Sequence, residues 1–323
     1  MFSALRVSGL ALALALLSSQ ALAASKCQVM KLAEIPVTME GLSPVMTAQI
    51  NGREARFIVD SGAFYSTMSA GAAQELGLQV GGLGPHARLK GVGGETSLGV
   101  TTVKEFVIAG QKLSRIDFAV GGSSTRYAGF LGQNFLGLAG VEYDLGHGAV
   151  RLMKTKDCGD IGLAYWSGGK PFTTLRIDSM EGADRHTIGT VEVNGVKLRA
   201  MFDTGASTSL LTLDAAKRLG VNPLKDGLPL DGFSWGVGQK RVKTWKARFD
   251  KIDIGGEMIS KPSLRIFDGE LGSADMLIGV DFFLSHRVFV DNQNRRMFFT
   301  YEGGPLFGVS PKGAVDHAGN AVD

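Results

Sequence analysis

The sequence is poor in cysteine, in histidine and in blocks of like charge. It has two cysteines and five histidines among 323 residues, and no two histidines lie at the spacing of a metal site. We therefore expect no metal and no cofactor. Lysine and arginine are scattered and the formal net charge is +3, so nucleic acid is not an expected partner. The lack of a Gly-x-Ser-x-Gly motif disfavours a serine hydrolase with that nucleophile.

Long apolar runs are also scarce, and the longest lies at the N-terminus. Val7–Leu17 is apolar apart from one serine and one glycine, follows Arg6, and precedes the small-x-small sequence at residues 21–23. These features predict a signal peptide over residues 1–24 and a mature protein that is periplasmic or secreted. A membrane anchor is the alternative, but a helical span needs about 20 apolar residues. We expect no stable membrane insertion after cleavage.

The two cysteines are Cys27 and Cys158. An even number of cysteines in an exported protein permits a disulfide, which here would link the mature N-terminus to the middle of the chain. Free thiols are the alternative.

The most informative feature is a pattern that occurs twice. Residues 57–63 read Phe-Ile-Val-Asp-Ser-Gly-Ala, and residues 200–206 read Ala-Met-Phe-Asp-Thr-Gly-Ala. At the offset that places Asp60 on Asp203, the two halves align without a gap over residues 50–78. An internal repeat of this length predicts two copies of one structural unit. Two such carboxylates can meet between the copies as an acid–base pair.

Each copy has signals for the same local structure. An Asn-Gly pair at residues 51–52 and 194–195 predicts a hairpin turn whose return strand ends at the aspartate. A short helix should follow, with Ser69 or Thr212 at its start and a glycine at its end. About 70 residues after each aspartate, two apolar residues and a glycine recur, where a glycine lets another backbone pass closely.

Between these signals, each half contains glycines that suit the tip of a mobile hairpin. The candidates for such substrate-covering hairpins, or flaps, are Gly91, Val92, Gly93, Gly94, Trp235, Gly236, Val237 and Gly238.

Together these residues resemble the aspartic proteases, and most closely the retropepsin-like branch. Alanine follows the motif glycine in both halves (Ala63 and Ala206), as in retroviral proteases. Residues 132–134 and 279–281 are similar to the retroviral Gly-Arg-Asn/Asp, although Gln133 and Val280 replace its arginine. The structural ion pair of that arginine should therefore be absent.

The resemblance implies an all-β, bilobal fold in which two homologous β-barrel lobes flank an active-site cleft. We expect an N-terminal lobe over residues 26–156, a linker over 157–170, a C-terminal lobe over 171–302 and a flexible tail over 303–323. Retroviral enzymes pair two chains, whereas this chain has both halves, so we expect a monomer.

The resemblance also implies roles for the repeated residues. Asp60 and Asp203 would share a proton and hold the attacking water, Ser61 and Thr204 would brace the two loops, and Gly62 and Gly205 would bring backbone amides close to the carboxylates. Pepsins usually have serine where this chain has Ala63 and Ala206. Without that hydroxyl bond the carboxyl pKa should be higher, so we expect activity from weakly acidic to near-neutral pH.

The resulting hypothesis is an aspartic endopeptidase that acts on peptides or proteins. One alternative is a peptide-binding or envelope-interaction protein on the same scaffold, whose carboxylates are not poised for catalysis. Another is an enzyme dedicated to a single protein substrate.

Overall fold

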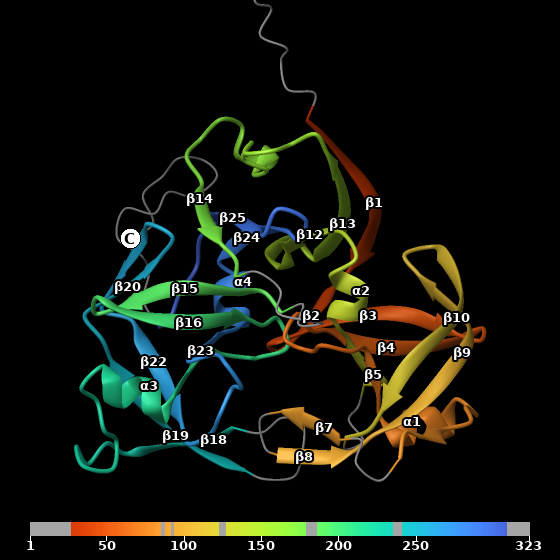
Figure 1. The fold of residues 1–323 in the computed structure, drawn as a ribbon, viewed down its shortest axis with the longest axis horizontal. Coiled ribbons are helices and arrows are strands. Elements are labelled where there is room, and N and C mark those ends of the chain that lie inside the picture. The colour runs from red at the N-terminus through yellow and green to blue at the C-terminus, as the bar shows by residue number, and fades with distance from the viewer. Residues whose placement is uncertain are drawn as a thin grey trace, which may run out of the picture.

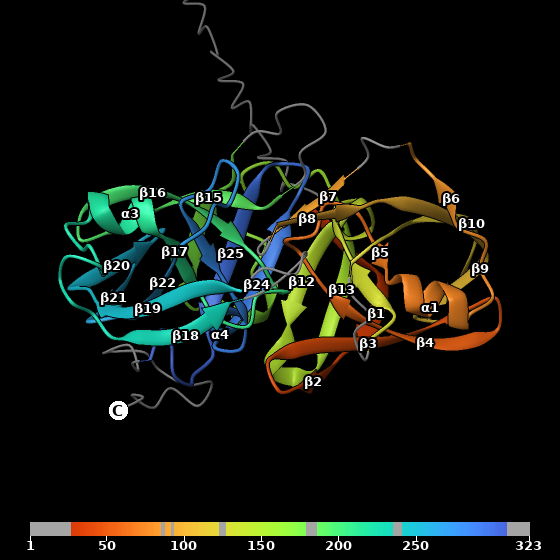
Figure 2. The ribbon, with the colours of Figure 1, turned by 90° about the horizontal axis from the view of Figure 1, so that it is seen from below.

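The protein consists of two β-rich lobes on either side of a shared central sheet (Figure 1). The structure is a computed structural model that describes residues 27–84, 88–91, 94–122, 127–178, 186–234 and 241–308. Strands dominate and helices are few and short, which confirms the predicted all-β, bilobal fold. Seen from below, the lobes lie on opposite sides of the central strands (Figure 2). In the described part of the chain, no helix has both the length and the apolar character that crossing a bilayer requires.

The first lobe is a closed barrel of six strands in the order β3-β4-β11-β5-β10-β9, closed by pairing of β9 with β3. The rings of Phe57, Phe106 and Phe118 are fully buried at its centre and contact one another. The elements of this lobe are β2 (Thr38–Glu40), β3 (Ser43–Ile50), β4 (Arg53–Val59), β5 (Thr67–Met68), α1 (Ala70–Glu75), β6 (Gly81–Gly82), β7 (Arg88–Gly91), β8 (Gly94–Ser97), β9 (Gly99–Ile108), β10 (Gln111–Val120), β11 (Gly129–Leu131) and α2 (Gln133–Leu136).

The second lobe has the matching order β15-β16-β23-β17-β22-β19 within a nine-stranded sheet. Its elements are β15 (Ile188–Val193), β16 (Val196–Phe202), β17 (Leu210–Thr212), α3 (Leu213–Arg218), β18 (Leu230–Ser234), β19 (Val242–Arg248), β20 (Lys251–Ile254), β21 (Glu257–Ser260), β22 (Ser263–Phe267), β23 (Met276–Ile278) and α4 (Val280–Phe283). The repeated sequence frame therefore forms the same strand arrangement in both lobes.

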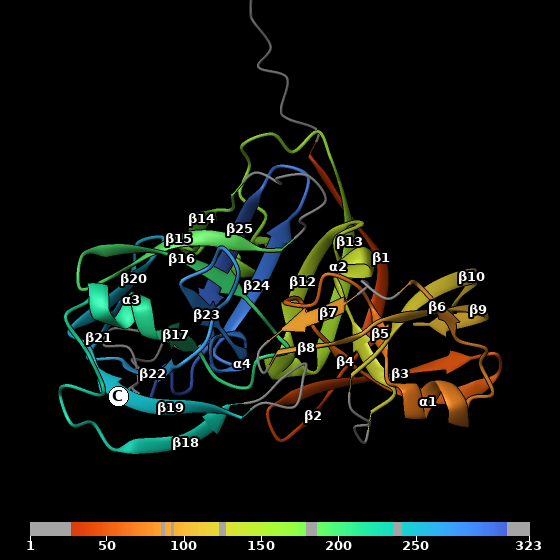
Figure 3. The same ribbon diagram turned by 60° about the horizontal axis from the view of Figure 1, so that its bottom comes forward.

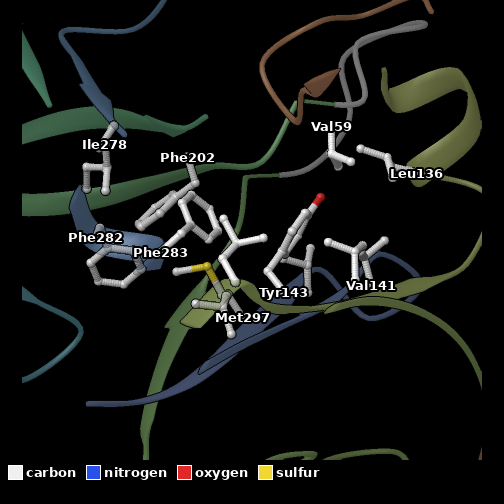
Figure 4. Close-up of a cluster of buried hydrophobic side chains, with 14 of the residues drawn as sticks. Val59, Leu136, Val141, Tyr143, Phe202, Ile278, Phe282, Phe283 and Met297 are labelled. Carbon is white, nitrogen blue, oxygen red and sulfur yellow. The ribbon is translucent and has the colours of Figure 1, made fainter. Parts of the chain in front are cut away.

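The central sheet joins the lobes because each half contributes strands to it, in the order β1-β13-β12-β24-β25-β14. The halves meet where β12 pairs with β24, with Tyr143 opposite Val288. Its elements, with two short 3-10 turns, are β1 (Gln28–Pro36), β12 (Gly140–Asp144), η1 (Leu145–His147), β13 (Ala149–Lys156), η2 (Tyr165–Ser167), β14 (Thr173–Arg176), β24 (His286–Asp291) and β25 (Arg296–Tyr301). Tyr143 of this sheet, Phe202 of β16 and Phe282 and Phe283 of α4 belong to one cluster of buried side chains (Figure 4).

The predicted turns and caps are confirmed. Asn51 and Asn194 take positive φ angles of 50° and 49°, the conformation that a two-residue hairpin turn requires. Ser69 and Thr212 cap α1 and α3 by accepting a hydrogen bond from the backbone amide three residues later, at 3.1 Å in both cases.

Both ends of the described chain are attached to the fold. Cys27 and Cys158 form a disulfide, as one of the two alternatives predicted. The expected flexible tail differs at its start: Leu306 and Phe307 are buried, and the carbonyl of Phe307 accepts a hydrogen bond from the Ser263 amide at 2.8 Å. The burial of these two large apolar side chains fixes the segment in place, although glycines precede it. The rest of that predicted tail lies outside the described residues.

Candidate active site

Asp60 and Asp203 occupy equivalent places at the ends of β4 and β16. In each lobe, the strand that ends just before the repeated glycine runs parallel to the aspartate strand. The Asp60 amide donates to the Leu131 carbonyl at 3.0 Å, and the Asp203 amide donates to the Ile278 carbonyl at 2.8 Å. The two aspartates are thus placed where a strand turns into a loop, as the sequence predicted.

The two carboxyl groups lie close together, each beside the glycine of the opposite loop, and interact directly with one another. Asp60 Oδ1 also accepts hydrogen bonds from the amides of Gly62 and Ala63, at 2.9 and 2.8 Å. Asp203 Oδ1 accepts one from the Gly205 amide at 2.8 Å, and the Ala206 amide donates to the Asp203 backbone carbonyl at 3.3 Å. Both side chains are half-buried, so the pair stays accessible to a reactant while its loops are fixed.

Ser61 and Thr204 link the two loops through crossed hydrogen bonds. The Ser61 amide donates to Thr204 Oγ1 at 3.0 Å, and the Thr204 amide donates to Ser61 Oγ at 2.9 Å. Each hydroxyl in turn donates to a backbone carbonyl of the opposite strand, Ser61 to Phe202 at 2.9 Å and Thr204 to Val59 at 2.7 Å. Both side chains are buried, so these bonds hold one loop rigidly against the other.

Gly62 and Gly205 are the points of closest approach. A Cβ atom built on Gly62 would overlap the Asp203 carboxylate, and one on Gly205 would overlap the Asp60 carboxylate. Each glycine therefore leaves the space that the opposite aspartate fills. The glycines of the later repeat act similarly: a Cβ atom on Gly132 would lie 2.7 Å from the Ala63 carbonyl oxygen, and one on Gly279 would lie 2.6 Å from the Ala206 oxygen.

The electrostatics of the pair favour a shared proton. Burial raises the pKa of Asp60 well above its usual value, and the charge of Asp203 and their mutual hydrogen bond raise it further. Burial also raises the pKa of Asp203, while hydrogen bonds from Asp60 and from backbone amides, and the charge of His186, act in the opposite direction. Two carboxyls this close release their protons as a coupled unit, so one proton is held while the second group is ionised.

A serine and an amide or carboxylate side chain support each loop from behind. Ser66 donates its amide and hydroxyl to Asn134 Oδ1 at 2.7 and 2.8 Å. Ser209 uses the same two groups on Asp281, with its hydroxyl 2.7 Å from Oδ1. Both serine hydroxyls accept a bond at 3.0 Å from the amide of the repeated glycine. The sequence alignment paired these serines, but their support of the loops was not predicted.

Three further residues make polar contacts with the Asp60 loop. Gln133, noted in the sequence as a replacement for arginine, is buried and donates from Nε2 to the Ser61 carbonyl at 2.8 Å. Tyr143 rises from β12 with its hydroxyl toward Val59 (Figure 4), and its hydroxyl interacts with the Ser61 side chain, which lowers the pKa of Tyr143 against the effect of burial. His186 Nε2 lies 3.0 Å from the Gly62 carbonyl oxygen. No sequence signal pointed to Tyr143 or His186, because both contacts join residues far apart in the chain.

The predicted hairpins occur in both lobes. Gly91 and Gly94 pair at the end of the β7–β8 hairpin, which lies at the junction of the lobes (Figures 1 and 3). In the second lobe, Ser234 pairs with Val242 as β18 and β19 converge. The remaining flap candidates, Val92, Gly93, Trp235, Gly236, Val237 and Gly238, lie outside the described residues. Among the residues that are described, no group of three or more histidine, cysteine or acidic side chains could hold a metal ion.

Comparisons with known proteins identify both halves. Residues 46–137 match the family model for "gag-polyprotein putative aspartyl protease", and residues 189–282 match the model for "Aspartyl protease". The chain is 29% identical over 108 residues to DNA damage-inducible protein 1 of Phaeosphaeria nodorum, covering 33% of this chain and 23% of that protein. It is 27% identical over 118 residues to the protein of that name in Neurospora crassa, covering 36% and 26%. The matches thus span about a quarter of these relatives. The chain belongs to the retropepsin-like aspartic protease family and contains two of its aspartyl protease domains in tandem.

Proposed function

We propose that this chain is an aspartic endopeptidase that hydrolyses peptide bonds with a water held between Asp60 and Asp203. The observation that supports this most directly is the close pair of interacting carboxyls on two cross-linked loops. A site built only to bind peptides has no need of two half-buried carboxyls that share a proton. Family membership makes the same chemistry the natural expectation.

The pair would act as combined acid and base. The ionised carboxylate removes a proton from the water, whose oxygen attacks the carbonyl carbon of the scissile peptide. The protonated carboxyl donates a hydrogen bond to the oxygen of the tetrahedral intermediate. The proton taken from the water is then passed to the leaving nitrogen as the C–N bond breaks, and the pair returns to its singly protonated state. Neither a metal nor a cofactor takes part in this sequence.

The surrounding residues would position the two carboxyls and control the access of substrate and water to them. Ser61 and Thr204 fix the loops, and Gly62 and Gly205 allow the carboxyls to approach. The β7–β8 and β18–β19 hairpins would close over a peptide or protein substrate and exclude water. Both aspartates come from one chain, so the proposal includes a monomeric enzyme.

The pKa directions support activity that extends to near-neutral pH. Activity requires one proton on the pair, so its alkaline limit is set by loss of that proton. Burial and the neighbouring charge raise the pKa of Asp60, which keeps the proton in place at higher pH. We therefore propose a pH range from weakly acidic to near-neutral.

We also propose that the enzyme is exported and acts in the periplasm or outside the cell. The charged, apolar and small-residue regions of residues 1–24 support this, as does the disulfide between Cys27 and Cys158. Disulfides persist in oxidising compartments and are rare in the cytosol.

Cleavage of a diverse peptide library between about pH 4 and 7.5 tests the proposal, comparing the mature protein with Asp203→Asn. Loss of general acid–base catalysis should lower cleavage by about 10²–10⁴-fold. Asp214→Asn is a matched control, because that aspartate is 88% exposed on α3 and should not alter cleavage. Circular dichroism would verify that each variant is folded.

Cleavage that survives in Asp203→Asn would contradict the proposed pair. If no folded form cleaves any peptide, the result favours the alternative, a non-catalytic peptide-binding or envelope-interaction protein. Capture of envelope proteins on Asp203→Asn would then identify either such a partner or a single dedicated substrate.

A further inference from the structure

His186 is fixed to the strand that carries Asp203. It stands two residues before β15, and the carbonyl of the next residue, Thr187, accepts a hydrogen bond from the Phe202 amide at 2.9 Å. The His186 carbonyl accepts a second bond from Arg295 Nη2 at 3.2 Å. The backbone of His186 is therefore held on the second lobe, directly beside the end of β16.

The imidazole of His186 reaches from the second lobe to the Asp60 loop. Its Nε2 lies 3.0 Å from the Gly62 carbonyl oxygen, so a proton on Nε2 is donated to that carbonyl. Its ring centroid lies 6.1 Å from that of Phe64. Gly62 is also the residue whose Cβ atom would overlap the Asp203 carboxylate. A single glycine thus stands between the imidazole and Asp203.

Within the described residues, a histidine contacts the loop on one side of the pair. At the offset that places Asp60 on Asp203, His186 aligns with Ser43, the first residue of β3. Serine cannot carry a positive charge, so the aligned position of the first lobe supplies no equivalent cation. The two carboxyls have the same local frame but different electrostatic surroundings.

We propose that His186 is a positioning residue that holds the Asp60 loop against Asp203 and, when protonated, favours the negative charge on Asp203, so that Asp60 holds the shared proton. In the proposed reaction this makes Asp203 the base toward water and Asp60 the acid toward the peptide carbonyl. The inference rests on the proposed function, but the coupling of His186 to Asp203 can be measured without it.

The other described charged groups near His186 have roles of their own. Among the described residues, Asp60 at the end of β4 shares the proton itself. Arg295 lies between β24 and β25 and donates to the backbone carbonyls of His186, at 3.2 Å, and, through Nε, of Asp178, at 2.8 Å. The Asp178 carboxylate, after β14, is paired with the guanidinium of Arg199 at 2.9 Å. Among these described groups, His186 is the one whose side chain contacts the Gly62 carbonyl of the Asp60 loop.

The pH dependence of kcat/KM separates the charge of His186 from its hydrogen bond. His186→Gln keeps a donor for the Gly62 carbonyl but cannot become positive. Its acid limb should move to higher pH by about half to one unit, because the singly ionised pair loses a favourable charge. His186→Leu loses the donor as well and should also lower the plateau kcat. His147→Gln, a histidine that is 58% exposed and paired with Asp144, should leave the limb unchanged. An unchanged acid limb in His186→Gln would overturn the proposal.

A second measurement does not require catalysis. The effect of His186→Gln on urea unfolding is measured between about pH 3 and 7, once in the wild-type protein and once in Asp203→Asn. If His186 acts through Asp203, the substitution changes the pH dependence of stability in the wild type and not in Asp203→Asn. The same change in both backgrounds would overturn the coupling. A wild type that cleaves no peptide overturns the proposed function instead, and the coupling is then decided by this cycle alone.

Discussion

Replacing Thr204 with valine removes one hydroxyl from the crossing between the active-site loops and preserves the shape of the side chain. Thr204 is fully buried, accepts from the Ser61 amide at 3.0 Å and donates to the Val59 carbonyl at 2.7 Å. In Thr204→Val the Ser61 amide has no partner, which costs about 1–3 kcal/mol, and the bond to Val59 contributes about 1 kcal/mol more. We expect a total loss of about 2–4 kcal/mol, with no cavity term because the two side chains are nearly equal in volume.

The chain offers a matched control. Thr244 is also fully buried, on β19, but its hydroxyl makes no hydrogen bond within the described part of the protein. Thr244→Val therefore removes an unsatisfied polar group and should be neutral or slightly stabilising, within about 1 kcal/mol. The two variants make the same chemical change at sites that differ in hydrogen bonding.

Urea unfolding at neutral pH, followed by tryptophan fluorescence, measures both changes in the free energy of unfolding. Peptide cleavage by the folded variants shows whether the loops still hold the carboxyls in register, and only Thr204→Val should lose activity. Equal stabilities for the two variants would refute the reasoning, because they would show that the crossed hydrogen bonds contribute nothing beyond the buried hydroxyl.

Three further predictions address the rest of the fold. Burial and a neighbouring charge raise the pKa of Asp60, so the folded state binds a proton that the unfolded state loses above about pH 4. In urea titrations, Asp60→Asn should therefore be more stable than the wild type at pH 7 but not at pH 3. Equal stability at pH 7 would contradict this. The disulfide links two cysteines 131 residues apart in the sequence. Replacing Cys27 and Cys158 with serine should therefore lower the free energy of unfolding by about 2–5 kcal/mol relative to the non-reduced protein. A loss below about 1 kcal/mol would show that the unfolded state is compact without the disulfide. Arg287 Nη2 lies 2.7 Å from the fully buried Glu142 across the β12–β24 junction. Arg287→Met should therefore lower the free energy of unfolding by about 1–3 kcal/mol, measured by calorimetry. An unchanged stability would mean that Glu142 is satisfied without Arg287.

The sequence allowed those parts of the fold to be predicted whose causes are local. The positive φ angles of Asn51 and Asn194 need only the residues of the turn, and the Ser69 and Thr212 caps need only the first helical turn. The close approach at the later glycines was predictable because the repeat placed an equivalent glycine in both halves.

Other features depend on contacts between distant segments. The pairing of β12 with β24 joins the halves through residues that carry no complementary signal in the sequence, since buried strands of either half are similarly apolar. The burial of Phe307 was missed because the glycines before it are typical of a tail. The support of the Asp60 loop by Tyr143 could be seen only after the central sheet had placed β12 beneath that loop.

The repeated frame and its departures have different consequences for the site. The frame supplies what must be equal on both sides, namely two aspartates, two hydroxyls that cross and two glycines that make room for the opposite carboxyl. Acid–base chemistry, however, requires two carboxyls in different protonation states, and an exactly symmetric pair would have no preferred base. The polar contacts of Gln133, Tyr143 and His186 all fall on the Asp60 loop, whereas the residues aligned with the first two, Val280 and Val290, have no side-chain donor or acceptor. Because both halves lie in one chain, such differences can accumulate on one loop alone, which a dimer of identical chains cannot achieve.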